Sequence, residues 1–201
     1  MPISLFNNRG KIESWFAKPI YVRNGFATSE HEQLKNWLLE FFIVNGDFKR
    51  TPELNVNTTH LMVDLKELEP FKTFTSILME EVNTFAKTMG YDTSENRLYM
   101  QNMWANLSRT GEYLFPHNHP GSFISGAYYV ESTSDVDFIR FYDNVQSMIP
   151  SADKPNEYSS EYVQYPCTEQ RLLLFKADLI HGCPALRGER KIVISFNIGL
   201  M

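Results

Sequence analysis

The sequence has 201 residues, a formal net charge of -5 at pH 7, and hydrophobic and aromatic fractions of 43% and 14%. This length fits one domain with a sizeable core, and the composition argues against a disordered chain. An acidic balance without a run of Lys or Arg argues against nucleic acid or a membrane surface as the main partner.

No targeting or disulfide pattern stands out. The first sixteen residues lack the basic-then-apolar layout of a signal peptide, and no stretch approaches the ~20 apolar residues of a membrane-spanning helix. Cys167 and Cys183 have no metal-type spacing, so we interpret them as reduced thiols. We therefore expect a cytoplasmic protein, which for a viral protein means the host cytoplasm.

Two segments of the first half have the apolar periodicity of helices. The first runs from Leu34 to Phe42, with Gly46 as its predicted stop. The second begins near Pro70, and Gly90 follows its last apolar residue. Both apolar stripes are expected to face a core, with no cofactor role.

From about residue 97 the pattern changes to short segments rich in aromatic and β-branched residues, which is typical of strands. Helices followed by strands favour an α+β, mainly β fold in which helices buttress one sheet of a jelly-roll-like sandwich. The polar stretch 143–168 is interpreted as a lid or binding loop, with a disordered surface excursion as the alternative. The predicted strands are 98–107, 122–131, 137–142, 171–176 and 190–199.

Three of the five histidines lie in the predicted β half. His117 and His119 are two positions apart, so in extended chain their side chains point to the same face. His181 follows a separate apolar strand. Imidazole suits iron, zinc, copper or nickel, and three such ligands on one face leave coordination sites open. A pair that is merely solvated or satisfied in the core is the alternative.

Arg190 lies nine positions after His181, at the start of an alternating strand. A guanidinium on an inner apolar face requires an anionic partner, because an unpaired buried charge is costly. A bound dicarboxylate would supply one through paired hydrogen bonds; a buried Asp143 or Asp178 is the alternative. The residues predicted to share its face are Ile192, Ile194 and Phe196.

Taken in order, these motifs resemble the iron(II)/2-oxoglutarate oxygenase superfamily, particularly its prolyl-hydroxylase-like branch, over roughly residues 98–199. The same layout resembles uncharacterised oxygenase-like proteins of phages and marine bacteria, whereas residues 1–97 match loosely. The resemblance implies a double-stranded β-helix of jelly-roll or cupin-like shape, with 1–97 as helical support and 98–201 as the core of a single domain. The stretches that carry it are Met103-Trp104-Ala105-Asn106, Gly111, His117-Asn118-His119, Ser125-Gly126-Ala127-Tyr128-Tyr129-Val130 and His181-Gly182-Cys183-Pro184 with Gly188-Glu189-Arg190.

The resemblance also implies a chemistry. Fe(II) would be bound by His117, His119 and His181, and Arg190 with Tyr129 would hold the far carboxylate of 2-oxoglutarate. The reaction would be hydroxylation of a substrate, with dioxygen consumed, 2-oxoglutarate decarboxylated to succinate, and ascorbate in a supporting role. The substrate, a small molecule or a peptide, is not readable, and a peptidyl proline is what the resemblance favours. Homodimerisation stays an open question. Candidates for the mouth of the site are Asn102, Trp104 and Tyr113.

His119 departs from the family pattern, which has Asp or Glu at this position. Three neutral imidazoles do not lower the net charge of bound Fe(II) as a carboxylate does. His119 is then a true ligand, or it swings away while Asp143 or Asp178 supplies the anion, or the fold has lost oxygenase chemistry. The rival function is a non-oxygenase metal-binding module, such as a zinc protein with three histidines and water. A virion or interaction protein that keeps only the shell is a third hypothesis.

Overall fold

The computed structural model describes residues 16–45, 56–60, 62–91, 93, 98–143 and 152–201. In this part of the chain, all strand pairs are antiparallel and form two sheets. The major sheet has the order β1-β8-β5-β10-β3-β2 and the minor sheet the order β4-β9-β6-β7. The strands are β1 (Ile20–Arg23), β2 (Asn57–Thr58), β3 (Leu98–Arg109), β4 (Leu114–His117), β5 (Ile124–Ser132), β6 (Phe138–Tyr142), β7 (Tyr162–Pro166), β8 (Leu172–Lys176), β9 (His181–Cys183) and β10 (Arg190–Leu200).

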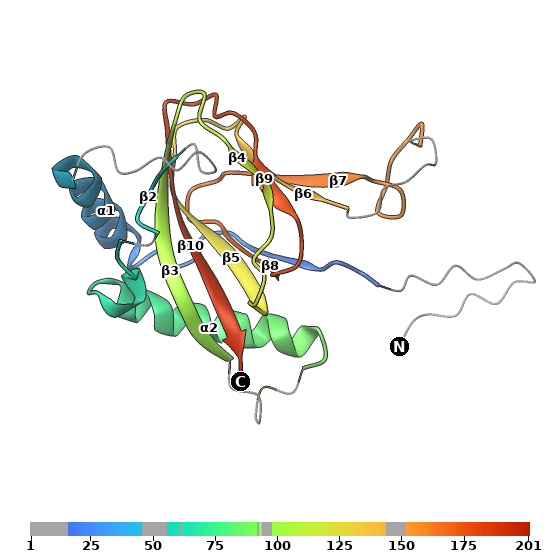
Figure 1. The fold of residues 1–201 in the computed structure, drawn as a ribbon, viewed down its shortest axis with the longest axis horizontal. Coiled ribbons are helices and arrows are strands. Elements are labelled where there is room, and N and C mark those ends of the chain that lie inside the picture. Colours follow the sequence, from blue (N-terminus) through green and yellow to red (C-terminus); the bar gives the residue numbers. More distant parts are fainter. Residues whose placement is uncertain (1–15, 46–55, 61, 92, 94–97, 144–151) are drawn as a thin grey trace, which may run out of the picture.

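The molecule has three layers (Figure 1). The helices α1 (His31–Asn45) and α2 (Phe71–Thr88), with the short 3-10 helix η1 (Leu65–Glu67), pack against one face of the major sheet. The minor sheet lies over the other face and encloses a second, smaller core. This is the double-stranded β-helix buttressed by helices that the sequence predicted.

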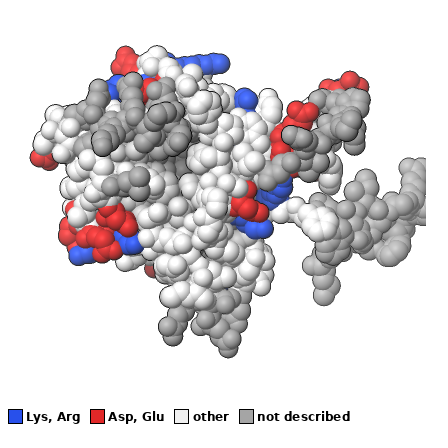
Figure 2. Space-filling model, in the orientation of Figure 1, with Lys and Arg blue, Asp and Glu red and all other residues white. Residues whose placement is uncertain are grey.

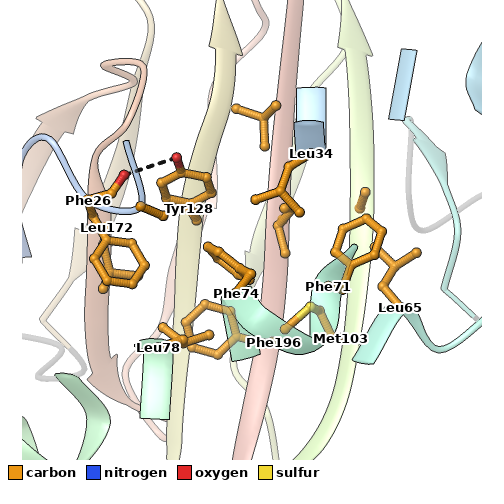
Figure 3. Close-up of a cluster of buried hydrophobic side chains, with 14 of the residues drawn as sticks. Phe26, Leu34, Leu65, Phe71, Phe74, Leu78, Met103, Tyr128, Leu172 and Phe196 are labelled. Carbon is orange, nitrogen blue, oxygen red and sulfur yellow. Dashed lines mark hydrogen bonds between the residues drawn. The ribbon is translucent and has the colours of Figure 1, made fainter. Parts of the chain in front are cut away.

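The alternation of side chains along the major sheet divides them between the two cores. On β10, Ile192, Ile194 and Phe196 pack toward the helices, whereas Val193 faces the minor sheet. On β5, Tyr128 lies in the helix-side cluster, where its hydroxyl donates to the carbonyl of Phe26 at 3.1 Å (Figure 3). Neighbouring residues of one strand therefore face opposite sides of the major sheet. An assignment that is wrong by one position would exchange the residues that face the helices with those that face the space between the sheets.

The segment between β2 and η1 is attached to β3 through side chains. The Met103 amide donates to Asp64 Oδ1 at 3.0 Å, and the Ala105 amide donates to Thr59 Oγ1 at 3.0 Å. These bonds satisfy backbone groups on the outer edge of β3, where β2 pairs with only two residues. They also fix His60, which follows Thr59, beside the cavity-facing side of β3.

The predicted helices and all five predicted strands are present, with small shifts of their ends. The predicted stop at Gly46 lies outside the described residues. The interpretation of 143–168 as one loop was wrong at its end, because β7 pairs there with β6 along its whole length. Four of the five positions in this strand are exposed, which hides its alternation in the sequence. Strands β1 and β2 lie in the region expected to be helical, and both form edges of the major sheet.

No described helix is long and apolar enough to cross a membrane. On the face of the molecule shown in Figure 2, acidic and basic side chains form small groups of mixed sign with uncharged surface between them.

We expect Gly126→Ala to lower the free energy of unfolding by about 1–3 kcal/mol, because it overpacks the sheet. A Cβ at Gly126 would lie 2.3 Å from Cζ of Phe196 and 2.7 Å from the carbonyl oxygen of Leu173. Urea denaturation of the wild type, Gly126→Ala, Phe196→Leu and the double variant measures the coupling between the two positions. Full additivity of the two changes would contradict the predicted contact.

Candidate metal and cosubstrate site

A cavity of about 230 Å³ lies between the two sheets. It receives side chains from β3, β5, β8 and β10 of the major sheet and from β4, β6 and β9 of the minor sheet. The wall combines apolar side chains with polar ones, four of them histidines, and such a mixture suits a small-molecule site. All three histidines singled out in the sequence line this cavity.

The backbone brings the three histidines together from two strands and a turn. His117 on β4 lies directly opposite His181 on β9 in the strand pairing. The His119 amide donates to the carbonyl of Ala177 at 2.9 Å, which holds the chain just after β4 against the end of β8. One ligand nitrogen from each of the three rings then lies within 4.8 Å of the other two.

Hydrogen bonds orient two of these rings. Nδ1 of His117 lies 2.7 Å from the carbonyl oxygen of Phe115, and Nδ1 of His181 lies 2.9 Å from that of Leu179. Each Nδ1 therefore donates its proton to a carbonyl, and the lone pair is left on Nε2, as in metal-bound histidines. Nε2 of His119 is 3.3 Å from Nε2 of His181. Two nitrogens at right angles on a common ion, each ~2.1 Å away, would be ~3 Å apart, so the pair fits one metal.

Two of the three rings, those of His119 and His181, are kept neutral by their surroundings. Burial, together with the neighbouring His117, lowers the pKa of His181 to about 3 and that of His119 to about 4. No Asp or Glu is among the described residues that line the cavity. Asp143 pairs with Lys18 at 2.5 Å, and the Asp178 side chain is 73% exposed. The hypothesis that one of these carboxylates replaces His119 is therefore not supported by their positions.

Tyr129 and Tyr128 point in opposite directions, as predicted. Tyr129 lines the cavity and is 1% exposed, whereas Tyr128 packs in the helix-side core. Burial raises the pKa of the Tyr129 phenol well above its usual value, so its hydroxyl stays protonated and can donate a hydrogen bond.

The prediction for Arg190 needs correction. Its guanidinium makes two hydrogen bonds to the carboxylate of Glu131, at 2.5 and 2.8 Å, and it does not line the cavity. Arg190 does share a face with Ile192, Ile194 and Phe196, but this face packs against the helices. The expected alternative, a carboxylate partner within the protein, is correct in kind, and that partner is Glu131 rather than Asp143 or Asp178.

The cationic residue in the cavity is Lys191, which the sequence analysis missed. Lys191 is 2% exposed, and its ammonium group contacts the thiol of Cys183. Among the described residues, no carboxylate lies within salt-bridge distance of it, so a bound anion would supply a partner that the buried charge otherwise lacks. The signal was available in the sequence. Lys191 is two and four positions from Val193 and Ser195, so all three face the same side of β10, and all three line the cavity.

Trp104 and His60 form the wall beside the histidines. The Trp104 ring contacts the rings of both His60 and His119, with centroid distances of 5.0 and 5.8 Å. The prediction that Trp104 lies near the mouth fits this position. Tyr113 instead packs edge-on against Phe115 at 4.8 Å and does not line the cavity. His60 had no assigned role, because only the folded chain brings it next to β3.

Residues 102–197 match the family described as "Putative 2OG-Fe(II) oxygenase". Among proteins of curated function, none matches this sequence. HygX from Streptomyces hygroscopicus, solved with nickel and 2-oxoglutarate, is 15% identical with a TM-score of 0.61, covering 90% of this chain and 83% of its own. A viral collagen prolyl hydroxylase from Paramecium Bursaria Chlorella virus-1 is 11% identical, with a TM-score of 0.57. The match covers 89% of this chain and 94% of the viral enzyme.

A prolyl hydroxylase from Trichoplax adhaerens, in complex with a hypoxia inducible factor peptide fragment, is 12% identical with a TM-score of 0.60. It covers 89% of this chain and 82% of its own. At these identities the solved structures establish the shared fold. The family match covers 96 of the 201 residues, all within the β-helix core, and supports a 2OG-Fe(II) oxygenase with the fold that these prolyl hydroxylases share.

Proposed function

We propose that this oxygenase hydroxylates a C–H bond of its substrate while 2-oxoglutarate is decarboxylated. One dioxygen molecule supplies one oxygen atom to the hydroxyl group and the other to succinate, and carbon dioxide leaves. Bound Fe(II) supplies the oxygen activation in such reactions, and the protein provides ligation, orientation and a dry pocket.

His117, His119 and His181 are proposed to hold the iron as three neutral ligands. The observation that carries this proposal is the convergence of their ring nitrogens within 4.8 Å in a cavity whose described lining contains no carboxylate. The hydrogen bonds from His117 and His181 to backbone carbonyls support it, because they fix the ring orientation before a metal arrives.

Lys191 and Tyr129 are proposed to bind the far carboxylate of 2-oxoglutarate. In the strand pairing Ser195 lies opposite Trp104 near the histidines, and Lys191 lies opposite Ser108 four residues along β10. Four residues of strand span ~13 Å, which leaves room for a five-carbon dicarboxylate between the metal and the ammonium group. Tyr129 of β5 pairs with Val193 of β10, so it lines the cavity between the positions of Ser195 and Lys191. We assign to Lys191 the role that the resemblance had given to Arg190.

The rival function, a metal-binding module without oxygenase chemistry, gains no specific observation. A zinc hydrolase would need a general base beside the metal, and no described acidic residue lines the cavity. A buried ammonium group and a buried phenol are also unnecessary in a metal site that binds no dicarboxylate.

We expect succinate to form from 2-oxoglutarate when the purified protein receives Fe(II), ascorbate and air. Anaerobic addition of Fe(II) and 2-oxoglutarate should first give a weak visible charge-transfer band, because the cosubstrate chelates the metal. Matched samples with Zn(II), or without oxygen, should form no succinate. A protein that retains Fe(II) but shows neither the band nor succinate would contradict the proposal and favour the rival module.

A further inference from the structure

A groove adjoins the metal cavity on the side away from Lys191. It has a volume of about 290 Å³ and shares two lining residues with the cavity, His60 and Trp104. These two rings thus form the boundary between the cavity and the groove. Asn102, which precedes Trp104 by two positions on the same face of β3, lies in the groove. The remaining residues that line it are Met62, Val63, Asp64 and Met103.

The charges around this groove are compensated within the protein. Its described lining contains one ionised side chain, Asp64, whose Oδ2 lies 3.1 Å from the ammonium group of Lys66. The other oxygen of Asp64 already accepts from the Met103 amide at 3.0 Å. Burial lowers the pKa of His60, so this ring is uncharged at neutral pH. In the cavity, Lys191 is the one described residue with a full charge.

The groove offers apolar and amide surface instead. Trp104 is 9% exposed and presents a ring for stacking, and Met62 is 54% exposed at the surface of the groove. Asn102 Oδ1 is buried without a hydrogen-bond partner among the described residues. A buried amide oxygen without a partner is costly, and rotation of this side chain would let it meet a ligand N–H or O–H.

We propose that the part of the substrate that reaches the metal is uncharged, lies against Trp104 and His60, and hydrogen-bonds to Asn102. An ammonium, carboxylate or phosphate in this groove would lose its hydration without gaining a counter-charge, which is unfavourable. We therefore expect free amino acids, nucleotides and polycations to bind this groove poorly through their charged groups. A neutral residue within a longer molecule, with its own polar groups blocked, fits the groove. This inference rests on the proposed function, because it takes Lys191 to be occupied by the cosubstrate.

Three probes of matched size test the charge preference: 3-phenylpropionamide, 3-phenylpropionate and 3-phenylpropylamine. Their binding to the Ni(II)- and 2-oxoglutarate-loaded protein is measured by ligand-observed NMR titration. We expect the neutral amide to bind at least ~10-fold more tightly than either ion. Trp104→Phe and Met62→Ala should weaken binding of the amide, and Phe16→Ala, an exposed aromatic outside the groove, should not.

Met62→Glu provides the reverse test, because a carboxylate at this exposed position should shift the preference toward the amine without disturbing a core. Equal binding of a charged probe to the wild type, or amide binding that Trp104→Phe and Met62→Ala leave unchanged, would overturn the proposal. Calorimetry of 2-oxoglutarate binding with Ni(II) keeps the two hypotheses distinct. If that binding fails, the proposed function fails, and the probe series on the metal-free protein still decides the charge preference of the groove.

Discussion

Lys191→Met is expected to raise the 2-oxoglutarate concentration for half-maximal succinate formation by roughly 30-fold or more. Removing one partner of a desolvated charge pair costs about 2–5 kcal/mol, and the lower end of that range gives this factor. Methionine keeps most of the length and apolar volume of lysine, so the change removes the charge without opening a cavity. The measurement is the dependence of the initial succinate rate on 2-oxoglutarate at saturating Fe(II).

Arg190→Met is the matched control, one position away on the same strand. It should leave the 2-oxoglutarate dependence within about twofold, because its guanidinium pairs with Glu131 on the helix side of the sheet. A loss of stability is expected instead, because the Glu131 side chain is 11% exposed and its largely buried carboxylate would lose this partner. If Arg190→Met raised the requirement and Lys191→Met did not, the assignment from the resemblance would be restored.

The contrast between Arg190 and Lys191 shows where sequence reasoning reached its limit. The alternation along β10 was read correctly, and the two sets of residues do face opposite sides. The more hydrophobic set was taken to face the site, but it packs against α1 and α2 in the larger core. A helix-covered sheet face needs continuous apolar surface, whereas a binding cavity tolerates polar and small residues such as Lys191 and Ser195.

The histidines were predictable for a different reason. A spacing of two positions places His117 and His119 on one side of extended chain, whatever the surrounding fold. The strands that present His117 and His181 were not predicted, because β4 and β9 have only four and three residues. Segments this short carry too little periodicity to distinguish a strand from a turn. His60 was beyond sequence reasoning, since its place beside Trp104 depends on side-chain bonds between distant segments.

His181→Ala is expected to abolish iron retention and to lower succinate formation at least ~100-fold. This ring is 6% exposed and packs against Phe175 at a centroid distance of 4.6 Å. Among the described residues, no fourth histidine belongs to this cluster, so none could take its place as a ligand. Because the substitution also removes buried volume, His181→Gln serves as a second variant of similar size. Iron content after desalting and the thermal unfolding midpoint, measured on both variants, separate loss of the metal from loss of the fold. Normal iron content in His181→Gln would contradict the ligand assignment.

His119 decides how the missing carboxylate affects the chemistry. If the three proposed histidines hold the metal as neutral ligands, it would keep its full double charge until the dianionic cosubstrate binds, so the wild-type site should favour 2-oxoglutarate. His119→Asp should retain iron yet raise the 2-oxoglutarate requirement by roughly tenfold, because a like charge then lies beside the cosubstrate. His119→Ala should lose both iron and turnover. If the wild type formed no succinate and His119→Asp did, the fold would have kept the site while losing the reaction, and histidine at this position would be the cause.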